Sequence, residues 1–354
     1  REAYMAALFA EIGGRAKDYS DRTVTSIFIG GGTPSLLSGE QIGQLMDRIR
    51  EQFAMAQDAE ITMEVNPGTA SAEKLRNFYT AGINRLSIGM QSAQAEELKN
   101  LGRIHDFEGF CQVYREAVEA GFTNINVDIM SGLPGQTLAS YRDTLEKVLH
   151  LEPMPQHISA YSLIVEEGTP FAAMAERGEL PLPEEETERA MYEETIEVLA
   201  KYGFHRYEIS NYARDGYECR HNVGYWIRRD YLGFGIGAAS LIDNVRFQNE
   251  KSLGAYLAHP LESREEEQTL TVQDRMEETM FLGLRLTRGV SCVDFAEQYG
   301  RTVEEVYGEV IARNVADGLL TVTERKENQK KDRLLALTKR GLDLSNYVMA
   351  QFLF

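Results

Sequence analysis

Three consecutive glycines follow an apolar segment near the start of the chain. Residues 26–35 read Ser-Ile-Phe-Ile-Gly-Gly-Gly-Thr-Pro-Ser, and the apolar part is typical of a buried strand. Three glycines remove side chains from one place, so the backbone of Gly30–Gly32 can lie directly against a polar ligand. Parallel α/β sheets bind their ligands at such strand ends. We therefore predict a ligand loop here, with a tight turn that binds nothing as the alternative.

Polar side chains lie at or near the ends of the apolar runs that follow. Glu64 and Asp128 stand among apolar neighbours, where a carboxylate is costly unless it has a partner. Amide or hydroxyl side chains follow four of the apolar runs, including the two that contain these carboxylates: they are those of Asn66, Gln91, Ser131 and Ser162. Polar residues can simply mark where strands become loops, which suits Asn66 and Ser131 but not the two carboxylates. We expect Glu64 and Asp128 to belong to a site at one mouth of the sheet.

Such a site requires a regular alternation of strands and helices. Apolar runs typical of strands occur at Ile27–Gly31, Ile61–Val65, Arg85–Met90, Ile125–Met130 and His157–Leu163. Amphipathic helical patterns lie between them, near residues 39–53, 72–81, 107–120, 137–150 and 184–202. One strand and one helix roughly every 25–40 residues predict a parallel α/β sheet, either doubly wound or curled into a (β/α) barrel.

Composition and charge limit the partners of the chain. It has 354 residues, 43% of them hydrophobic, and a formal net charge of −18 from 55 acidic and 37 basic side chains. This surface repels nucleic-acid phosphates and anionic lipid, and no apolar run approaches the roughly 18 residues of a membrane span. Cys111, Cys219 and Cys292 are too far apart for a disulfide or metal motif, and no signal-peptide pattern occurs. We expect a cytoplasmic protein that binds neither nucleic acid nor membranes.

The pattern changes after residue 203. Residues 207–212 alternate as a strand does, and Cys219–Trp226 combines a histidine with aromatic side chains. From about residue 270 the pattern is mainly helical, with strand signals at Leu319–Val322 and Leu334–Leu337. Helices with a small hairpin predict a winged-helix-like module. Its acidic helical stretch at 303–316 is unsuited to DNA, so we expect a structural or docking role.

Five motifs occur together and in order: Gly30–Ser35, Glu64–Pro67, Gly89–Ser92, Leu101–Arg103 and Asp128–Thr137. With them the chain resembles the radical S-adenosylmethionine (SAM) family, and within it the oxygen-independent coproporphyrinogen III oxidase branch, over nearly its whole length. His221–Trp226, which reads His-Asn-Val-Gly-Tyr-Trp, matches the His-Asn-x-x-Tyr-Trp signature of the HemW-type haem chaperones in that branch. The resemblance thus favours a haem chaperone, with the oxidase, which decarboxylates two propionate side chains, as the alternative.

The resemblance also implies binding sites for SAM and haem. Gly31, Gly32 and Thr33 would hold the methionyl end of SAM, whose ammonium would donate to Glu64. Further SAM positions of the family correspond to Gln91, Arg103, Asp128, Ser162 and Ala239. In the oxidase the first three serve a second SAM molecule, so their partner here stays open. The haem positions correspond to His221, Asn222, Tyr225 and Trp226. His221 would be the axial ligand of the iron, and the two aromatic side chains would offer flat faces to the porphyrin.

One family motif is absent. The Cys-x-x-x-Cys-x-x-Cys motif, which binds a [4Fe–4S] cluster, does not occur, and Cys111, Cys219 and Cys292 lack its spacing. The chain begins at Arg1 within a helical pattern, so we expect the first strand and the cluster loop to lie outside it. Without the cluster no 5′-deoxyadenosyl radical forms, and the chain as given is expected to be inactive in catalysis.

These expectations combine into three parts of one protein. Residues 1–202 would form a partial (β/α) barrel, residues 203–269 its continuation with the haem-binding segment, and residues 270–354 a small helical C-terminal domain. The full protein would bind SAM, a [4Fe–4S] cluster and haem, and would deliver haem to haem-requiring proteins. Whether it cleaves SAM, whether it is also an enzyme and how it assembles stay open.

Overall fold

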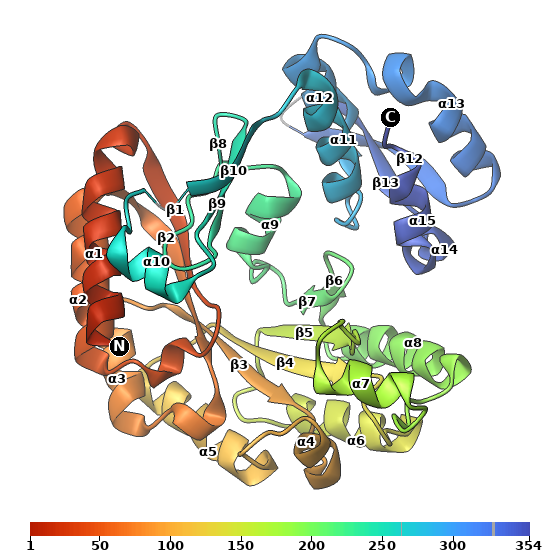
Figure 1. Ribbon diagram of the computed structural model, residues 1–354. Coiled ribbons are helices and arrows are strands. Elements are labelled where there is room, and N and C mark those ends of the chain that lie inside the picture. The colour runs from red at the N-terminus through yellow and green to blue at the C-terminus, as the bar shows by residue number, and fades with distance from the viewer. Residues whose placement is uncertain (263, 328–329) are drawn as a thin grey trace.

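The computed structural model describes residues 1–262, 264–327 and 330–354 (Figure 1). Its main sheet has seven strands in the order β1-β2-β3-β4-β5-β7-β6. The strands are β1 (Thr23–Ile29), β2 (Ala54–Val65), β3 (Arg85–Gln91), β4 (Ile125–Ser131), β5 (His157–Ser162), β6 (His205–Arg206) and β7 (Asn211–Ala213). Strands β1 to β5 are parallel, whereas β7 pairs antiparallel with β5 and β6 antiparallel with β7. The parallel α/β sheet predicted from the five apolar runs is confirmed.

Helices cover the outer face of this sheet, which curls into a half-barrel (Figure 1). They are α1 (Glu2–Arg15), α2 (Gly39–Gln52), α3 (Ala72–Thr80), α4 (Ala95–Asn100), α5 (Phe107–Ala120), α6 (Leu138–Leu149) and α8 (Glu185–Lys201), whereas the short α7 (Pro170–Glu176) buries none of its residues. Short 3-10 turns lie at Ala16–Tyr19, Pro34–Leu36 and Pro67–Thr69. In α2, Ser38 and Gln41 cap the first turn reciprocally, while Ile42, Met46 and Ile49 bury one face. The predicted partial barrel is therefore confirmed.

The two faces of the sheet differ in polarity. Apolar side chains such as Leu86 and Val127 are buried against the helices. The alternate positions carry polar groups, and Ser87, Asn126 and His157 hydrogen-bond to one another across neighbouring strands. Because successive strand residues point to opposite faces, these polar groups line the inside of the half-barrel. We call this inner face the lumen.

The prediction of one strand over residues 207–212 is wrong, because the chain reverses direction between β6 and β7. The Glu208 carboxylate accepts hydrogen bonds from the N–H of Ser210 over 2.7 Å and from the side-chain amide of Asn211 over 2.6 Å. The guanidinium of Arg206 donates to the carbonyl of Ile209 over 3.1 Å. These local bonds reverse the chain between β6 and β7, so the alternation reflects a polar turn with a strand residue at each side.

A second, small sheet packs on the first helix. It consists of β8 (Ala239–Ile242), β9 (Val245–Asn249) and β10 (Arg264–Thr269) in the order β10-β9-β8. Helix α10 (Leu253–Ala258) connects β9 to β10. The fully buried Glu11 of α1 accepts from the amide of Asn249 over 2.7 Å and from the hydroxyl of Tyr256 over 2.8 Å. Glu11 also pairs with Arg15 at 3.1 Å. This buried polar cluster joins the small sheet to α1.

The C-terminal module has its own apolar core, separate from that of the barrel. Its elements are α11 (Val272–Gly283), β11 (Val290–Ser291), α12 (Cys292–Tyr299), α13 (Val303–Ala316), β12 (Leu320–Glu327), β13 (Lys330–Leu337), α14 (Lys339–Asp343) and α15 (Ser345–Ala350). The strands form an antiparallel sheet in the order β11-β13-β12, which confirms a helical, winged-helix-like module. The exact three-part division of the chain remains a prediction. Within the described residues, none of the helices combines the length and apolarity needed to cross a bilayer.

Helix α9 (Arg220–Trp226) connects these parts. In Figure 1 it lies on the concave side of the half-barrel, between the small sheet and the C-terminal module. It packs against the edge strand β1 on one side and against α11 on the other. The segment that matches the chaperone signature is therefore a helix at the open side of the barrel.

Candidate functional site

The glycine turn after β1 lies against the carboxylate of Glu64. The N–H of Gly31 donates to Oε2 of Glu64 over 3.1 Å. Gly31 and Gly32 have φ of 83° and 62°, a left-handed conformation that glycine adopts without strain. A Cβ on Gly30 would lie 2.8 Å from the Phe28 ring and 3.0 Å from the carboxyl carbon of Glu64, whereas one on Gly31 or Gly32 would meet open space. The turn therefore brings bare backbone to Glu64 and leaves room above it.

Glu64 and Asp128 form an electronegative pair at the lumen side of β2 and β4. Burial raises the pKa of both carboxyls, and that of Asp128 rises to about 6, with the charge of Glu64 adding to the effect of burial. Asp128 accepts hydrogen bonds from the amide of Asn126 over 2.7 Å and from the hydroxyl of Ser87 over 3.3 Å. Two carboxyls with raised pKa values favour a ligand that carries positive charge, as the ammonium and sulfonium groups of SAM do.

Gln91 and Arg103 join these carboxyls through a residue that sequence reasoning missed. The hydroxyl of Tyr161 donates to Oε1 of Gln91 over 2.9 Å. Burial raises the pKa of Tyr161, the charge of Asp128 adds to this, and the charge of Arg103 opposes it. Gln91 thus contacts the phenol directly at the end of β5, and the charges of Asp128 and Arg103 act on it from nearby. Tyr161 lies two positions after Ser159, and this strand alternation could have placed it on the lumen face.

The other expected SAM residues lie around this group. Thr33 precedes the 3-10 turn at Pro34–Leu36. Ser162 shares a hydrogen bond of 3.0 Å with Ser131 at the end of β4. Ala239 begins β8 in the small sheet, a different part of the fold. Ser162 directly follows Tyr161 in β5, and its side chain bonds Ser131 rather than the phenol. The roles of Ser162 and Ala239 in SAM binding stay predictions.

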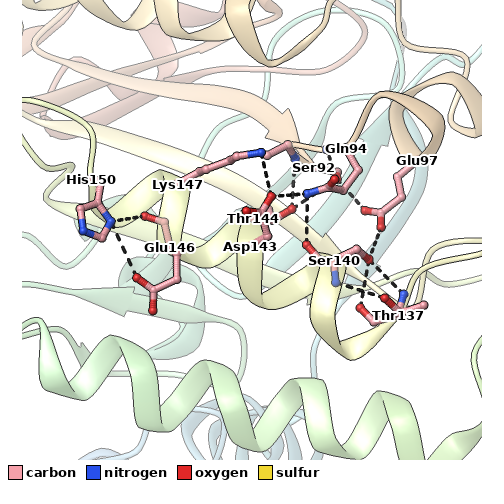
Figure 2. Close-up of polar contacts among 11 residues, drawn as sticks. Ser92, Gln94, Glu97, Thr137, Ser140, Asp143, Thr144, Glu146, Lys147 and His150 are labelled. Carbon is pink, nitrogen blue, oxygen red and sulfur yellow. Dashed lines mark hydrogen bonds and ion pairs between the residues drawn. The ribbon is translucent and has the colours of Figure 1, made fainter.

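A buried carboxylate behind Gln91 holds two loops at the mouth together. Glu97, only 5% exposed, accepts hydrogen bonds from the hydroxyls of Ser92 and Ser140, both over 2.6 Å (Figure 2). It also accepts from the amide of Gln136 over 3.0 Å. Gln91 itself has φ of 69°, which is uncommon for a residue with a side chain. Glu97 thus secures the strand end that presents Gln91.

The histidine of the His-Asn-x-x-Tyr-Trp signature is held from three sides. Nδ1 of His221 lies 3.0 Å from the hydroxyl of Ser26, and Nε2 lies 3.0 Å from the hydroxyl of Tyr225. The ring of Phe28 stacks on the imidazole with centroids 5.2 Å apart. Burial lowers the pKa of His221, so the imidazole is neutral at pH 7, the form that binds iron. Because Phe28 also lies beside Gly30, one aromatic ring separates His221 from the glycine turn.

The remaining signature residues lie on other sides of α9. Trp226 packs into a small apolar cluster with Leu286, and the guanidinium of Arg285 lies 4.3 Å from its ring centre. Asn222 lies half-buried in the first turn of the helix. In this structure Trp226 thus supports α9 from its buried side. The roles of Asn222 and Trp226 as haem contacts stay predictions.

A hydrogen-bonded column runs along the lumen from Asp128 to the start of α9. Asn126 donates to Asp128 through its amide, and its Oδ1 lies 2.6 Å from Nδ1 of His157. Nε2 of His157 lies 2.9 Å from the hydroxyl of Tyr207, which accepts from the N–H of Cys219 over 3.3 Å. Burial lowers the pKa of His157 well below its ordinary value, so its neutral ring offers one donor and one acceptor to the column. We refer to these five residues as the lumen column.

The cysteines are not arranged as metal ligands. Cys219 is buried, and Cys111 and Cys292 are half-buried thiols in other parts of the fold. Among the residues that the structure describes, no group of three or more His, Cys, Asp and Glu side chains could hold a metal ion. The glycine turn and its two carboxyls therefore fit SAM, whereas these residues supply no ligand set for a [4Fe–4S] cluster.

Comparison with known proteins agrees with this geometry. Residues 3–148 match the model of the radical SAM superfamily, and residues 270–344 match the HemN C-terminal domain. The heme chaperone HemW of Bacillus subtilis is 37% identical, covering 99% of this chain and 91% of its own length, and that of Lactococcus lactis is 35% identical, covering 99% and 89%. The solved structure of coproporphyrinogen III oxidase (HemN) from Escherichia coli superposes with a TM-score of 0.83 at 26% identity, covering 99% of this chain and 82% of that one.

These similarities extend over nearly the whole chain and include both its barrel and its C-terminal module. Membership of the radical SAM superfamily implies SAM and an iron–sulfur cluster as cofactors of the family. The chain belongs to the HemW heme-chaperone family, a branch of the radical SAM superfamily with the fold of HemN.

Proposed function

We propose that this protein binds haem through His221 of α9, binds SAM at the glycine turn, and passes haem to haem-requiring proteins in the cytoplasm. The observation that carries the proposal is the position of His221, a neutral imidazole at the open side of the half-barrel. The relatives that match along nearly the whole chain are named heme chaperones, which supports the same function.

For haem, the ring of His221 is the group that would meet the iron. Its Nε2 is occupied by the hydroxyl of Tyr225, so ligation through this nitrogen requires that hydroxyl to release it. Burial keeps the imidazole uncharged, and no proton has to leave before it binds a metal. Tyr225 then stands beside the bound group, where its ring can pack on a porphyrin.

For SAM, the chain supplies a backbone cradle and negative charge. SAM brings a sulfonium cation and an ammonium group when it binds. Glu64, which already accepts from Gly31, would accept from the ammonium, and the positive charge would lower the raised pKa of Glu64 and of Asp128. Gln91, which bonds Tyr161, and Arg103, whose charge acts on the same phenol, would orient the rest of the molecule.

The second candidate is coproporphyrinogen III oxidase. It is favoured by the close match of folds with HemN, at 26% identity. The HemW relatives reach 35–37% identity over a similar length, which favours the chaperone.

A haem titration followed by absorbance tests the proposal. It uses the full-length, cluster-reconstituted protein beside this chain, each as wild type and with His221→Ala. We expect His221→Ala to weaken haem binding at least about tenfold. His150→Ala is the matched control, because His150 lies at the C-terminal end of α6 and its side chain is 68% accessible. Failure of the wild type to bind haem, or conversion of coproporphyrinogen III to protoporphyrinogen IX at enzymatic rates, would contradict the chaperone function.

A further inference from the structure

The carboxylate of Glu60 holds the beginning of α9, although it belongs to β2. Glu60 is 5% exposed and accepts hydrogen bonds from the N–H groups of Arg220 and His221, both over 3.0 Å, and from the thiol of Cys219 over 3.4 Å. Cys219, at the N-cap, makes no side-chain cap bond, and the first turn of α9 has no acidic residue. Glu60 therefore satisfies helix-terminal N–H groups for which the helix has no cap of its own.

Ser26 contacts the side chain of His221, whose backbone N–H is bonded to Glu60. Its hydroxyl lies 3.0 Å from Nδ1 of His221, and Ser26 belongs to β1, the strand next to that of Glu60. The backbone of His221 is thus bonded to β2, and its ring is bonded to β1. Two neighbouring strands of the barrel, and not α9 alone, set the position of the imidazole.

We propose that Glu60 and Ser26 are positioning residues for His221 as a haem ligand, an inference that rests on the proposed function. Ser26 accepts from Nδ1–H, which leaves the lone pair on Nε2. The phenol of Tyr225, a more acidic donor than an alcohol, donates to that lone pair until iron replaces it. Histidines that bind metals commonly donate their other ring N–H to such an outer partner, which fixes tautomer and orientation. Glu60 and Ser26 would act through His221 and not as ligands themselves.

An exposed contact at the same helix end provides a matched control. Asp58 lies on β2 two residues before Glu60 and accepts from the guanidinium of Arg220 over 2.8 Å. Its side chain is 81% accessible, so the ion pair is screened by solvent. Asp58→Asn removes a carboxylate from the same end of α9 without touching the N–H of His221.

The test is a titration of the full-length protein with haem, read by affinity and by the absorption spectrum of the bound haem. The variants are Ser26→Ala and Glu60→Gln, with Ser26→Thr, which keeps the hydroxyl, and Asp58→Asn as controls. We expect Ser26→Ala and Glu60→Gln to bind haem roughly 10–100-fold more weakly, with a changed axial-ligand spectrum. Both controls should stay within about twofold of the wild type and keep its spectrum.

The fluorescence of Trp226, the one tryptophan of the sequence, reports the state of α9 in the haem-free variants. If Glu60→Gln alters this emission before haem is added, the substitution has disturbed α9 itself. The haem titration of Ser26→Ala then tests the proposal alone. Wild-type affinity and spectrum in Ser26→Ala, together with loss of haem in His221→Ala, would overturn the positioning role and leave the proposed function intact. Unchanged haem binding in His221→Ala would instead overturn the ligand role of His221, and with it this proposal.

Discussion

Replacing Asp128 with asparagine should stabilise the protein at neutral pH. The difference between an ordinary carboxyl pKa near 4 and the value of about 6 for Asp128 corresponds to about 3 kcal/mol. The folded state holds its proton more tightly than the unfolded state, so stability falls as pH rises from about 4 to about 6, and the cost is complete above that. Since Asp128 keeps some exposure, this is an upper value. Asn retains an oxygen that can accept from Asn126 and Ser87.

Urea unfolding of wild type and Asp128→Asn at pH 8 and pH 5 measures this cost. We expect the variant to gain up to about 3 kcal/mol at pH 8 and about half of that at pH 5, because the wild-type carboxyl is largely protonated in the folded state at the lower pH. Asp143→Asn is the control, since a hydrogen bond from Lys147 lowers the pKa of Asp143 and the variant should be no more stable than wild type. SAM titration should show weaker binding to Asp128→Asn. A variant less stable than wild type at pH 8, or a gain that does not change with pH, would refute the reasoning.

Three further substitutions test the surroundings of the site. Glu97→Ala should lower the free energy of unfolding by about 2–4 kcal/mol, measured in urea, because two buried donors and a half-buried one lose their acceptor. Gly89→Ala should weaken SAM binding roughly tenfold in a calorimetric titration, since its Cβ would lie 2.9 Å from Nε2 of Gln91. Arg285→Lys keeps the charge but loses the stacking on Trp226, so tryptophan emission should shift and stability should fall by about 1 kcal/mol.

Each of these substitutions has a control or a contrary outcome. Glu96→Gln alters the exposed neighbour of Glu97 and should leave unfolding unchanged. Gly43→Ala adds a Cβ in open space on α2 and should leave SAM binding unchanged. Equal effects of the two glycine variants on SAM binding would contradict the crowding argument at Gly89. Emission of Arg285→Lys identical to that of the wild type would show that the guanidinium does not stack on the tryptophan in solution.

The parallel strands and the glycine turn were predictable because their signals are local. A run such as Ile125–Met130 alternates apolar residues with Asn126 and Asp128, and a serine follows it with glycine and proline close by. Gly31 and Gly32 adopt a left-handed backbone conformation that favours glycine, and Gly30 leaves room for the carboxyl group of Glu64. Carboxylates such as Asp128 stand out because an apolar run makes them conspicuous.

The hydrogen bonds from Glu60 and Ser26 to α9 were not predictable, because they join residues far apart in sequence. Glu60 lies 161 positions before His221, and Ser26 lies 195 positions before it. Nothing near Glu60 in the sequence distinguishes it from the many surface glutamates of an acidic chain. The turn at Glu208 was missed for the related reason that its side chain satisfies the backbone locally, which imitates strand alternation without a strand partner.

The lumen column gives a short helix the protection of the barrel core against hydrogen exchange. A helix of seven residues is marginal by itself, and its amides would normally exchange quickly. The N–H of Cys219, however, is bonded to Tyr207, whose partner His157 is itself bonded to Asn126. Freeing that N–H leaves a buried donor without a partner, at about 1–3 kcal/mol, unless Tyr207 and the rest of the column move with it. Exchange at the start of α9 should therefore follow the opening of the barrel as one cooperative unit, at the rate of its parallel strands.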